Sequence, residues 1–160
     1  MRNYFGKWIT KQATLDDKII LLVGDIGFGI FDEFKRKFPD RYYNVGICEQ
    51  SMVSMAAGLA LAGMKPYVYT ITPFLIERAF EQVKVDIDAM NLNVKLIGYA
   101  DYPEQGITHR EVLKPDILNK IFSNLKSYEP KSELHAGVVL DKSYQRGEPT
   151  FISLKQAKWG

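Results

Sequence analysis

The chain has 160 residues, with 21 basic and 19 acidic side chains and a formal net charge of +2. Because the basic residues are scattered, the composition argues against binding to nucleic acid or to a membrane surface. The single cysteine, Cys48, excludes an intramolecular disulfide, and no stretch approaches the roughly 20 apolar residues of a membrane span. We therefore expect a soluble, cytoplasmic protein whose residues 1–160 form one domain.

The hydrophobic pattern predicts alternating helices and strands in the first half of the chain. Apolar residues at helical spacing indicate a helix over 3–15, and the apolar run 19–23 is typical of a strand buried on both faces of a parallel sheet. A glycine-rich turn over 24–29 then leads into a short helix that ends by Phe38. The turn has no Lys-Ser/Thr pair, so a plain tight turn is as good an interpretation as a phosphate cradle.

The alternation continues to the end of the chain. We expect further strands over 43–47, 67–71, 94–99, 125–128 and 150–154, and helices over 51–62, 75–90, 116–122 and 132–144. In the helix over 132–144, Leu134, Val138 and Val139 are expected to face inward. These elements predict an α/β fold: a single three-layer domain whose mostly parallel sheet of about six strands has helices on both faces.

The most unusual of these elements is the helix over 51–62. It carries no charged side chain, so we expect it to be buried nearly all round, partly against another subunit or domain. Glu49 and Gln50 stand at its entrance. Glu49 has two interpretations: a carboxylate that complements the helix dipole, or one held at a buried interface to exchange a proton with a ligand.

The second interpretation of Glu49 is favoured by a resemblance. The segment NVGICEQSMVSMAAGLALAG, residues 44–63, resembles the motif in the pyrimidine-binding domain of transketolases and 1-deoxyxylulose-5-phosphate synthases. The resemblance implies that Glu49 hydrogen-bonds the N1′ atom of the aminopyrimidine of thiamine diphosphate, with Gln50 beside it among the cofactor-binding residues. It also implies that Asp25 and Ile26, in the turn after the first strand, approach the thiamine.

Two further segments extend the resemblance. TITPFLIERAFEQVKVD, residues 70–86, is similar to the family's S-I-x-x-F-x-T-x-R-x-x-E-Q-I-x-x-D run, which places Phe74 against the aminopyrimidine and makes Arg78 a cofactor-binding candidate. GITH, residues 106–109, resembles G-P-T-H, whose histidine lies over the reactive end of the cofactor, so His109 is the second catalytic candidate. Ile107 replaces the proline there, and an exposed loop histidine is the alternative.

Other family features are absent. The Mg²⁺-diphosphate motif G-D-G, followed about 25 to 30 residues later by Asn, has no counterpart, and neither has the transketolase C-terminal domain. We therefore expect a separate diphosphate-binding subunit to hold the Mg²⁺ and the diphosphate, and we assign no metal ligand to this chain. The resemblance implies a transketolase-like transferase subunit that is inactive without that partner.

Assembly and rival functions follow from the same features. Small residues in the uncharged helix predict a homodimer through residues 49–62, and a heterotetramer with the partner subunit. A non-catalytic assembly or regulatory module with the same fold is one alternative. A small-molecule binder of flavodoxin-like type is another, supported only by the glycine-rich turn.

Overall fold

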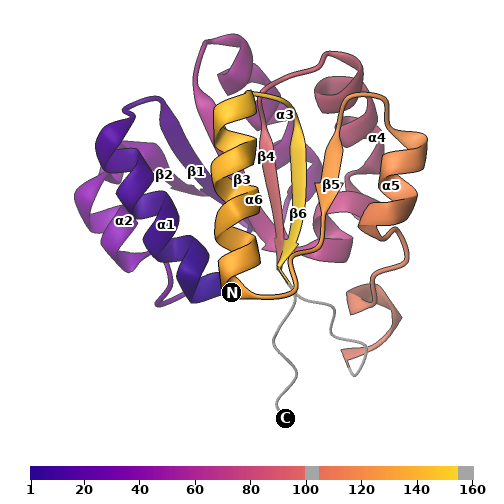
Figure 1. Ribbon diagram of the computed structural model, residues 1–160, viewed down its shortest axis with the longest axis horizontal. Coiled ribbons are helices and arrows are strands. Elements are labelled where there is room, and N and C mark those ends of the chain that lie inside the picture. The colour runs from indigo at the N-terminus through magenta and orange to yellow at the C-terminus, as the bar shows by residue number, and fades with distance from the viewer. Residues whose placement is uncertain (100–104, 155–160) are drawn as a thin grey trace.

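A six-stranded sheet lies between two layers of helices in the computed structural model, which describes residues 1–99 and 105–154 (Figure 1). All neighbouring strands are parallel, in the order β2-β1-β3-β4-β6-β5. The strands are β1 (Ile19–Val23), β2 (Tyr42–Asn44), β3 (Lys65–Ile71), β4 (Lys95–Tyr99), β5 (Lys126–Tyr128) and β6 (Thr150–Leu154). The predicted α/β fold is confirmed, and all carboxyl ends of the strands share one edge, the lower one in Figure 1.

Helices cover both faces of this sheet. One face carries α1 (Arg2–Leu15), α2 (Asp32–Lys37) and α6 (Glu133–Arg146), and the other carries α3 (Glu49–Leu61) and α5 (Pro115–Ile121). The helix predicted over 75–90 also lies on the α3 face, but it is not uniform. It consists of the π-helix η2 (Phe74–Arg78), α4 (Phe80–Gln82) and the π-helix η3 (Val83–Ala89). Two 3₁₀ turns, η1 (Pro39–Arg41) and η5 (Ile107–His109), complete the described elements.

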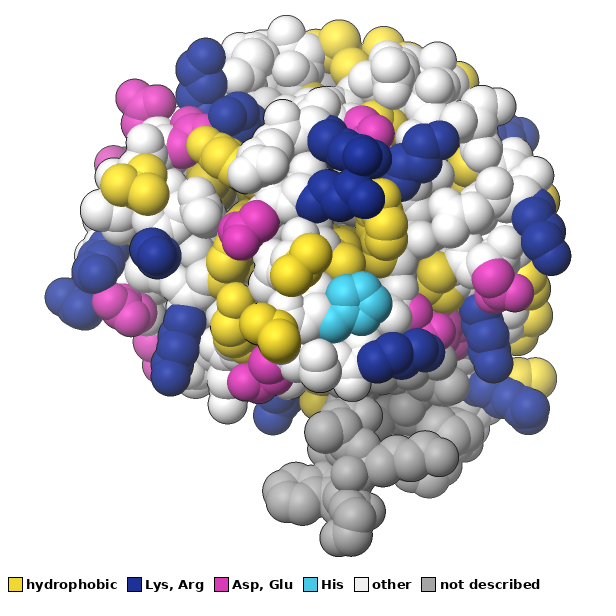
Figure 2. Space-filling view, viewed as in Figure 1, with side chains coloured by type: hydrophobic (Ala, Val, Ile, Leu, Met, Phe, Trp, Pro, Cys, Tyr) yellow, Lys and Arg dark blue, Asp and Glu magenta, His cyan; other side chains and the backbone are white. Residues whose placement is uncertain are grey.

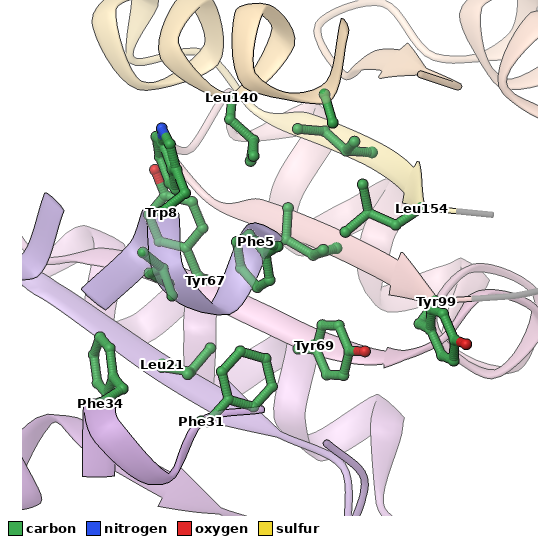
Figure 3. Close-up of a cluster of buried hydrophobic side chains, with 14 of the residues drawn as sticks. Phe5, Trp8, Leu21, Phe31, Phe34, Tyr67, Tyr69, Tyr99, Leu140 and Leu154 are labelled. Atoms are coloured by element: carbon green, nitrogen blue, oxygen red, sulfur yellow. The ribbon is translucent and has the colours of Figure 1, made fainter. Parts of the chain in front are cut away.

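The core under α1, α2 and α6 is rich in aromatic rings (Figure 3). Phe31 meets Tyr69 edge-on at 4.9 Å between ring centroids, and Phe5 stacks on Tyr69 at 5.9 Å. Burial raises the pKa of Tyr67 well above its usual value, and Trp8 Nε1 donates to Asp141 Oδ1 at 2.8 Å. These rings anchor α1 on the sheet through a large buried apolar area.

The opposite core is mainly aliphatic and supports α3. Its fully buried members include residues of β1 and β3, of α3 and of the helical segment 74–89: Leu22, Met52, Val53, Ala56, Val68, Leu75, Ile76 and Val83. Asp88, on the same helical segment, is buried as well. Its carboxylate accepts hydrogen bonds from the backbone N–H groups of Asn124, at 2.8 Å, and Leu125, at 2.7 Å. A carboxylate can be buried in this way where backbone donors converge on it.

The inward face of α6 was also predicted incorrectly. Leu134 is 81% exposed and Val138 is 59% exposed, whereas Val139 is buried as expected. The buried stripe of α6 runs through Ala136, Val139 and Leu140, so Leu134 and Val138 lie on a different side of the helix. Figure 2 shows the face covered by α1 and α6, where hydrophobic side chains are interspersed with charged ones.

Helix α3 is buried on one side only. Met52, Val53, Ala56 and Ala57 face the sheet, but Met55 and Leu61 are exposed. The expectation of burial nearly all round is therefore not met within this chain. None of the helices in the described residues combines the length and the apolar character needed to cross a membrane.

Candidate functional site

Glu49 is the first residue of α3 and follows the carboxyl end of β2 closely in the chain. Only 2% of its side chain is exposed, and its Oε2 atom accepts a hydrogen bond of 2.9 Å from Arg78 Nη1. The helix N-terminus also favours a negative charge at this position. Glu49 is thus a buried carboxylate whose cationic partner comes from a helix 29 positions further along the chain.

Arg78 and Phe74 lie one turn apart on η2. The guanidinium carbon of Arg78 is 3.9 Å from the centroid of the Phe74 ring, a cation–π contact. Phe74 in turn meets His109, with ring centroids 4.8 Å apart and ring planes at 68°. The structure therefore brings four predicted residues into one continuous series of contacts: Glu49, Arg78, Phe74 and His109.

His109 belongs to η5, in the loop between β4 and α5. Its backbone N–H donates to the Gly106 carbonyl at 3.1 Å, and its Nδ1 atom lies 3.1 Å from Thr108 Oγ1. The side chain is half-buried, whereas that of Ile107, two residues earlier, is largely exposed. His109 therefore faces Phe74 rather than extending freely from the loop.

A hollow of about 260 Å³ opens beside Glu49. It is lined by Ile47, Cys48, Glu49, Gln50, Ser51 and Arg78. Gln50 is exposed at its rim, and the Cys48 thiol donates to the Val45 carbonyl at 2.8 Å. The Glu49 side chain thus forms part of the wall of a hollow lined largely by polar residues.

Asp25 and Ile26 lie in the turn after β1. Asp25 has a positive φ of 53° and exchanges two hydrogen bonds of 3.1 Å with the Asn44 side chain. Ile26 packs against the aromatic core. Among the described residues, no hydrogen bond or ring contact joins either of them to Glu49, Arg78, Phe74 or His109.

Gly27, in the middle of this turn, is required for close packing. A Cβ atom on Gly27, whose φ is +91°, would lie only 2.6 Å from the Phe31 ring. A side chain there would clash with the aromatic core and strain the backbone. This geometry agrees with a tight turn.

Sequence reasoning missed two residues that organise the site. Asn44 Oδ1 accepts from the backbone N–H groups of Asp25 and Gly46, each at 3.1 Å, and so ties together the loops after β1 and β2. Glu77 accepts from the backbone of the His109 loop. The position of Asn44 before Val-Gly is typical of an Asx turn, which was a usable signal. Nothing local indicated the role of Glu77, because its partners are about 35 residues away.

Comparison with known proteins gives the family. The family model for the transketolase pyrimidine-binding domain matches residues 1–158. The chain is 40% identical over 124 residues to an apulose-4-phosphate transketolase subunit of Actinobacillus succinogenes, covering 76% of this chain and 40% of that protein. It is 36% identical over 157 residues to 1-deoxy-D-xylulose-5-phosphate synthase of Neisseria meningitidis, covering 92% of this chain and 23% of that protein. The chain thus spans less than half the length of these curated relatives.

Solved transketolase structures have the same fold as this chain. A split-gene transketolase, described as an inactive β4 tetramer, superposes with a TM-score of 0.86 at 26% identity, covering 98% of this chain and 50% of that chain. A transketolase from Campylobacter jejuni superposes with a TM-score of 0.83 at 17% identity, covering 96% and 25% respectively, and shares the fold.

Fold and site together define a parallel α/β domain with a buried carboxylate at the carboxyl edge of its sheet. The chain belongs to the transketolase pyrimidine-binding domain family. Membership in this family implies thiamine diphosphate as the cofactor.

Proposed function

We propose that this chain is the pyrimidine-domain subunit of a thiamine-diphosphate-dependent, transketolase-like enzyme, and that Glu49 is its catalytic carboxylate. The observation that carries the proposal is the environment of Glu49: a side chain 2% exposed, beside a polar hollow, with one side-chain partner, Arg78, among the described residues. A buried carboxylate at a helix N-terminus that opens on a hollow is suited to proton exchange with a bound ligand.

The residues present fit an aminopyrimidine. This ring is flat and has nitrogen atoms at its edge, so it requires an aromatic face and a hydrogen-bonding carboxylate. Phe74 provides the face and Glu49 the carboxylate, with Arg78 between them. When bound, thiamine diphosphate supplies a thiazolium carbon that attacks the carbonyl of a ketose or 2-oxo acid.

Each residue of the chain has a separate task in this proposal. Glu49 shares a proton with the N1′ atom, Phe74 stacks on the ring, and Gln50 and Arg78 line the entry to the carboxylate. His109 donates a hydrogen bond to a substrate oxygen from above Phe74. The turn that holds Asp25 and Ile26 borders the thiamine.

A partner subunit completes the site. We assign the Mg²⁺ and the diphosphate to a separate diphosphate-binding chain. We also propose that the present chain is inactive without that partner and that it is located in the cytoplasm. Two relatives support a divided enzyme: one is itself named as a subunit of a transketolase, and another is a split-gene transketolase described as an inactive β4 tetramer.

Helix α3 is the proposed homodimer contact. Its exposed side carries Met55 and Leu61, next to a hollow of about 360 Å³ lined by Leu22, Tyr43, Met55, Gly58 and Leu59. Covering such apolar surface stabilises an interface by about 25 cal/mol per Å². We expect a dimer in sedimentation at micromolar concentration and a shift toward monomer for Met55→Lys, with Lys142→Met on α6 as the control. A monomeric wild-type chain would contradict this contact.

Substitution of Glu49 tests the proposed chemistry. The chain is mixed with its diphosphate-binding partner, thiamine diphosphate and Mg²⁺, and ketose cleavage is measured. We expect Glu49→Gln to lower kcat by about 10²–10⁴-fold, because the amide cannot share a proton in the same way. Glu81→Gln, an exposed glutamate on α4, is the matched control. Full activity of Glu49→Gln would refute the role of Glu49.

The rival function is a non-catalytic assembly module. The exposed apolar side of α3 supports a protein–protein contact whether or not the chain takes part in catalysis. Ketose cleavage by the mixed subunits, measured with thiamine diphosphate and Mg²⁺, separates the two functions, since an assembly module binds the partner subunit but gives no cleavage that depends on Glu49.

A further inference from the structure

The His109 loop is held by Glu77, which precedes Arg78 on η2. Glu77 Oε1 accepts two hydrogen bonds from the backbone of this loop, from Val112 N and from Leu113 N, the second at 2.9 Å. Among the described residues, the other backbone bonds near His109 are local: His109 N–H to the Gly106 carbonyl, at 3.1 Å, and Arg110 N–H to the Ile107 carbonyl, at 3.3 Å. Local bonds shape the loop, but they do not determine its position relative to the sheet.

The same turn of η2 contributes three side chains to three different parts of the site. Phe74 contacts the His109 ring, Arg78 pairs with Glu49, and Glu77 holds the backbone three and four residues after His109. A carboxylate that accepts two backbone N–H groups makes charge-assisted bonds, which are stronger than neutral ones. The distance between the His109 and Phe74 rings therefore depends on the hydrogen bonds that Glu77 accepts from the backbone of the His109 loop.

We propose that Glu77 is a positioning residue: it sets the place of His109 over the Phe74 ring by holding the backbone at Val112 and Leu113. This inference rests on the proposed function, in which His109 faces the substrate. Glu77 itself touches neither the cofactor nor the substrate. Its effect on catalysis passes through the loop, and a small misplacement of a catalytic group is sufficient to slow a reaction substantially.

The hold on the loop is tested first in the chain by itself. Trypsin can cut after Arg110, which is exposed, whereas the bond after Lys114 precedes proline and resists the enzyme. We expect Glu77→Ala to raise the rate of cleavage at Arg110 about tenfold or more, since cleavage follows local opening. Glu77→Gln, whose amide oxygen still accepts hydrogen bonds, should be cut at close to the wild-type rate. Glu81→Ala is the control, and equal rates for all variants would overturn the proposal.

Hydrogen exchange on the wild-type chain provides a measurement that needs no variant and so does not depend on the folding of Glu77→Ala. We expect the amides of Val112 and Leu113 to be protected, although the Val112 side chain is exposed. Exchange at the rate of an unstructured peptide at both amides would contradict the hold by Glu77.

The effect on catalysis is tested in the assembled enzyme with a double-mutant cycle. We expect Glu77→Ala to lower kcat about tenfold or more while the affinity for thiamine diphosphate stays the same, and to cost nothing further in a His109→Ala background. Glu77→Gln should recover most of the loss. Independent, multiplying effects of the two substitutions would overturn the positioning role. If the assembled wild type has no transferase activity, the proposed function fails, while the trypsin and exchange results still decide whether Glu77 holds the loop.

Discussion

Two partly buried ion pairs lie at opposite edges of the sheet, and their carboxylates differ in the number of hydrogen bonds that they accept. At the amino edge, Asp16 Oδ2 accepts from Lys65 Nζ at 2.6 Å and from the Tyr144 hydroxyl at 2.8 Å, and Asp16 Oδ1 accepts from Lys18 N–H at 3.0 Å. At the carboxyl edge, the described residues give Glu49 a single side-chain partner, Arg78. A carboxylate with three donors is part of the scaffold, whereas one with a single donor beside a hollow retains capacity for a ligand.

The electrostatics of the amino-edge pair follow from these contacts. Burial alone would raise the pKa of Asp16, but the hydrogen bonds from Lys65, Lys18 and Tyr144 outweigh it and lower the pKa. The hydrogen bond to Asp16 raises the pKa of Lys65. Because the folded-state pKa of Asp16 lies below its unfolded value, its stabilising contribution is present above about pH 4 and is lost as the pH falls through the lowered value.

The largest effect on stability is expected from Asp16→Asn. The substitution removes the charge that Lys65 and Tyr144 bond to, so we expect the free energy of unfolding to fall by about 2–3 kcal/mol, measured by urea unfolding at pH 7. The loss should shrink as the pH is lowered below about 4. For comparison, Glu49→Gln should change the free energy of unfolding by less than about 1 kcal/mol, since it keeps an acceptor for Arg78. Equal losses in the free energy of unfolding for Asp16→Asn and Glu49→Gln would show that the two ion pairs contribute alike to stability.

A smaller effect is expected from Arg78→Met, which leaves the Glu49 carboxylate buried without its cation. Because Arg78 is itself 41% exposed, we expect a loss of only about 1 kcal/mol in the free energy of unfolding. The double variant Glu49→Gln/Arg78→Met should recover part of it. Lys37→Met, which breaks an exposed pair with Glu33, is the matched control. If the loss in the free energy of unfolding of the double variant equals the sum of the losses of the two single variants, the two side chains do not interact.

The last effect is a pH dependence and concerns Lys95, another amino-edge cation, which donates to the Glu148 carbonyl and has no carboxylate bonded to it among the described residues. Burial lowers the pKa of Lys95 to about 7. Between about pH 7 and about pH 10.4 the unfolded chain holds this proton and the folded chain does not, so the contribution of Lys95 to stability rises with pH.

Replacement of Lys95 should remove that pH dependence. We expect Lys95→Met to flatten the stability curve between about pH 7 and about pH 10 by at most about 1.4 kcal/mol per pH unit and to stabilise the protein below about pH 7. The Glu148 carbonyl keeps a donor in the variant, because Thr150 Oγ1 bonds to it at 3.0 Å. Urea unfolding at several pH values, with exposed Lys142→Met as the control, gives the comparison. Parallel curves for Lys95→Met and wild type would show that Lys95 is protonated in the folded protein.

Local pattern in the sequence determined much of the fold. Strands β1 and β6 have the predicted bounds, because a continuous apolar run between polar turns is typical of a strand buried on both faces. The motif around Glu49 and the segment from Phe74 to Arg78 also predicted the family that the comparisons show. These features are encoded in short stretches, so they can be recognised without knowledge of distant partners.

Tertiary structure alone decided which distant groups meet. The pairing of Glu49 with Arg78, the capture of the His109 loop by Glu77 and the burial of Asp88 all join residues about 30 or more positions apart. The same holds for the outward side of α6, where Leu134 and Val138 satisfy helical periodicity but lie away from the core. Periodicity specifies that a helix has an apolar stripe. Which side of the helix packs on the sheet depends on how distant parts of the chain fold together. The same is true of the polar partners of its side chains. No short stretch of sequence contains that information.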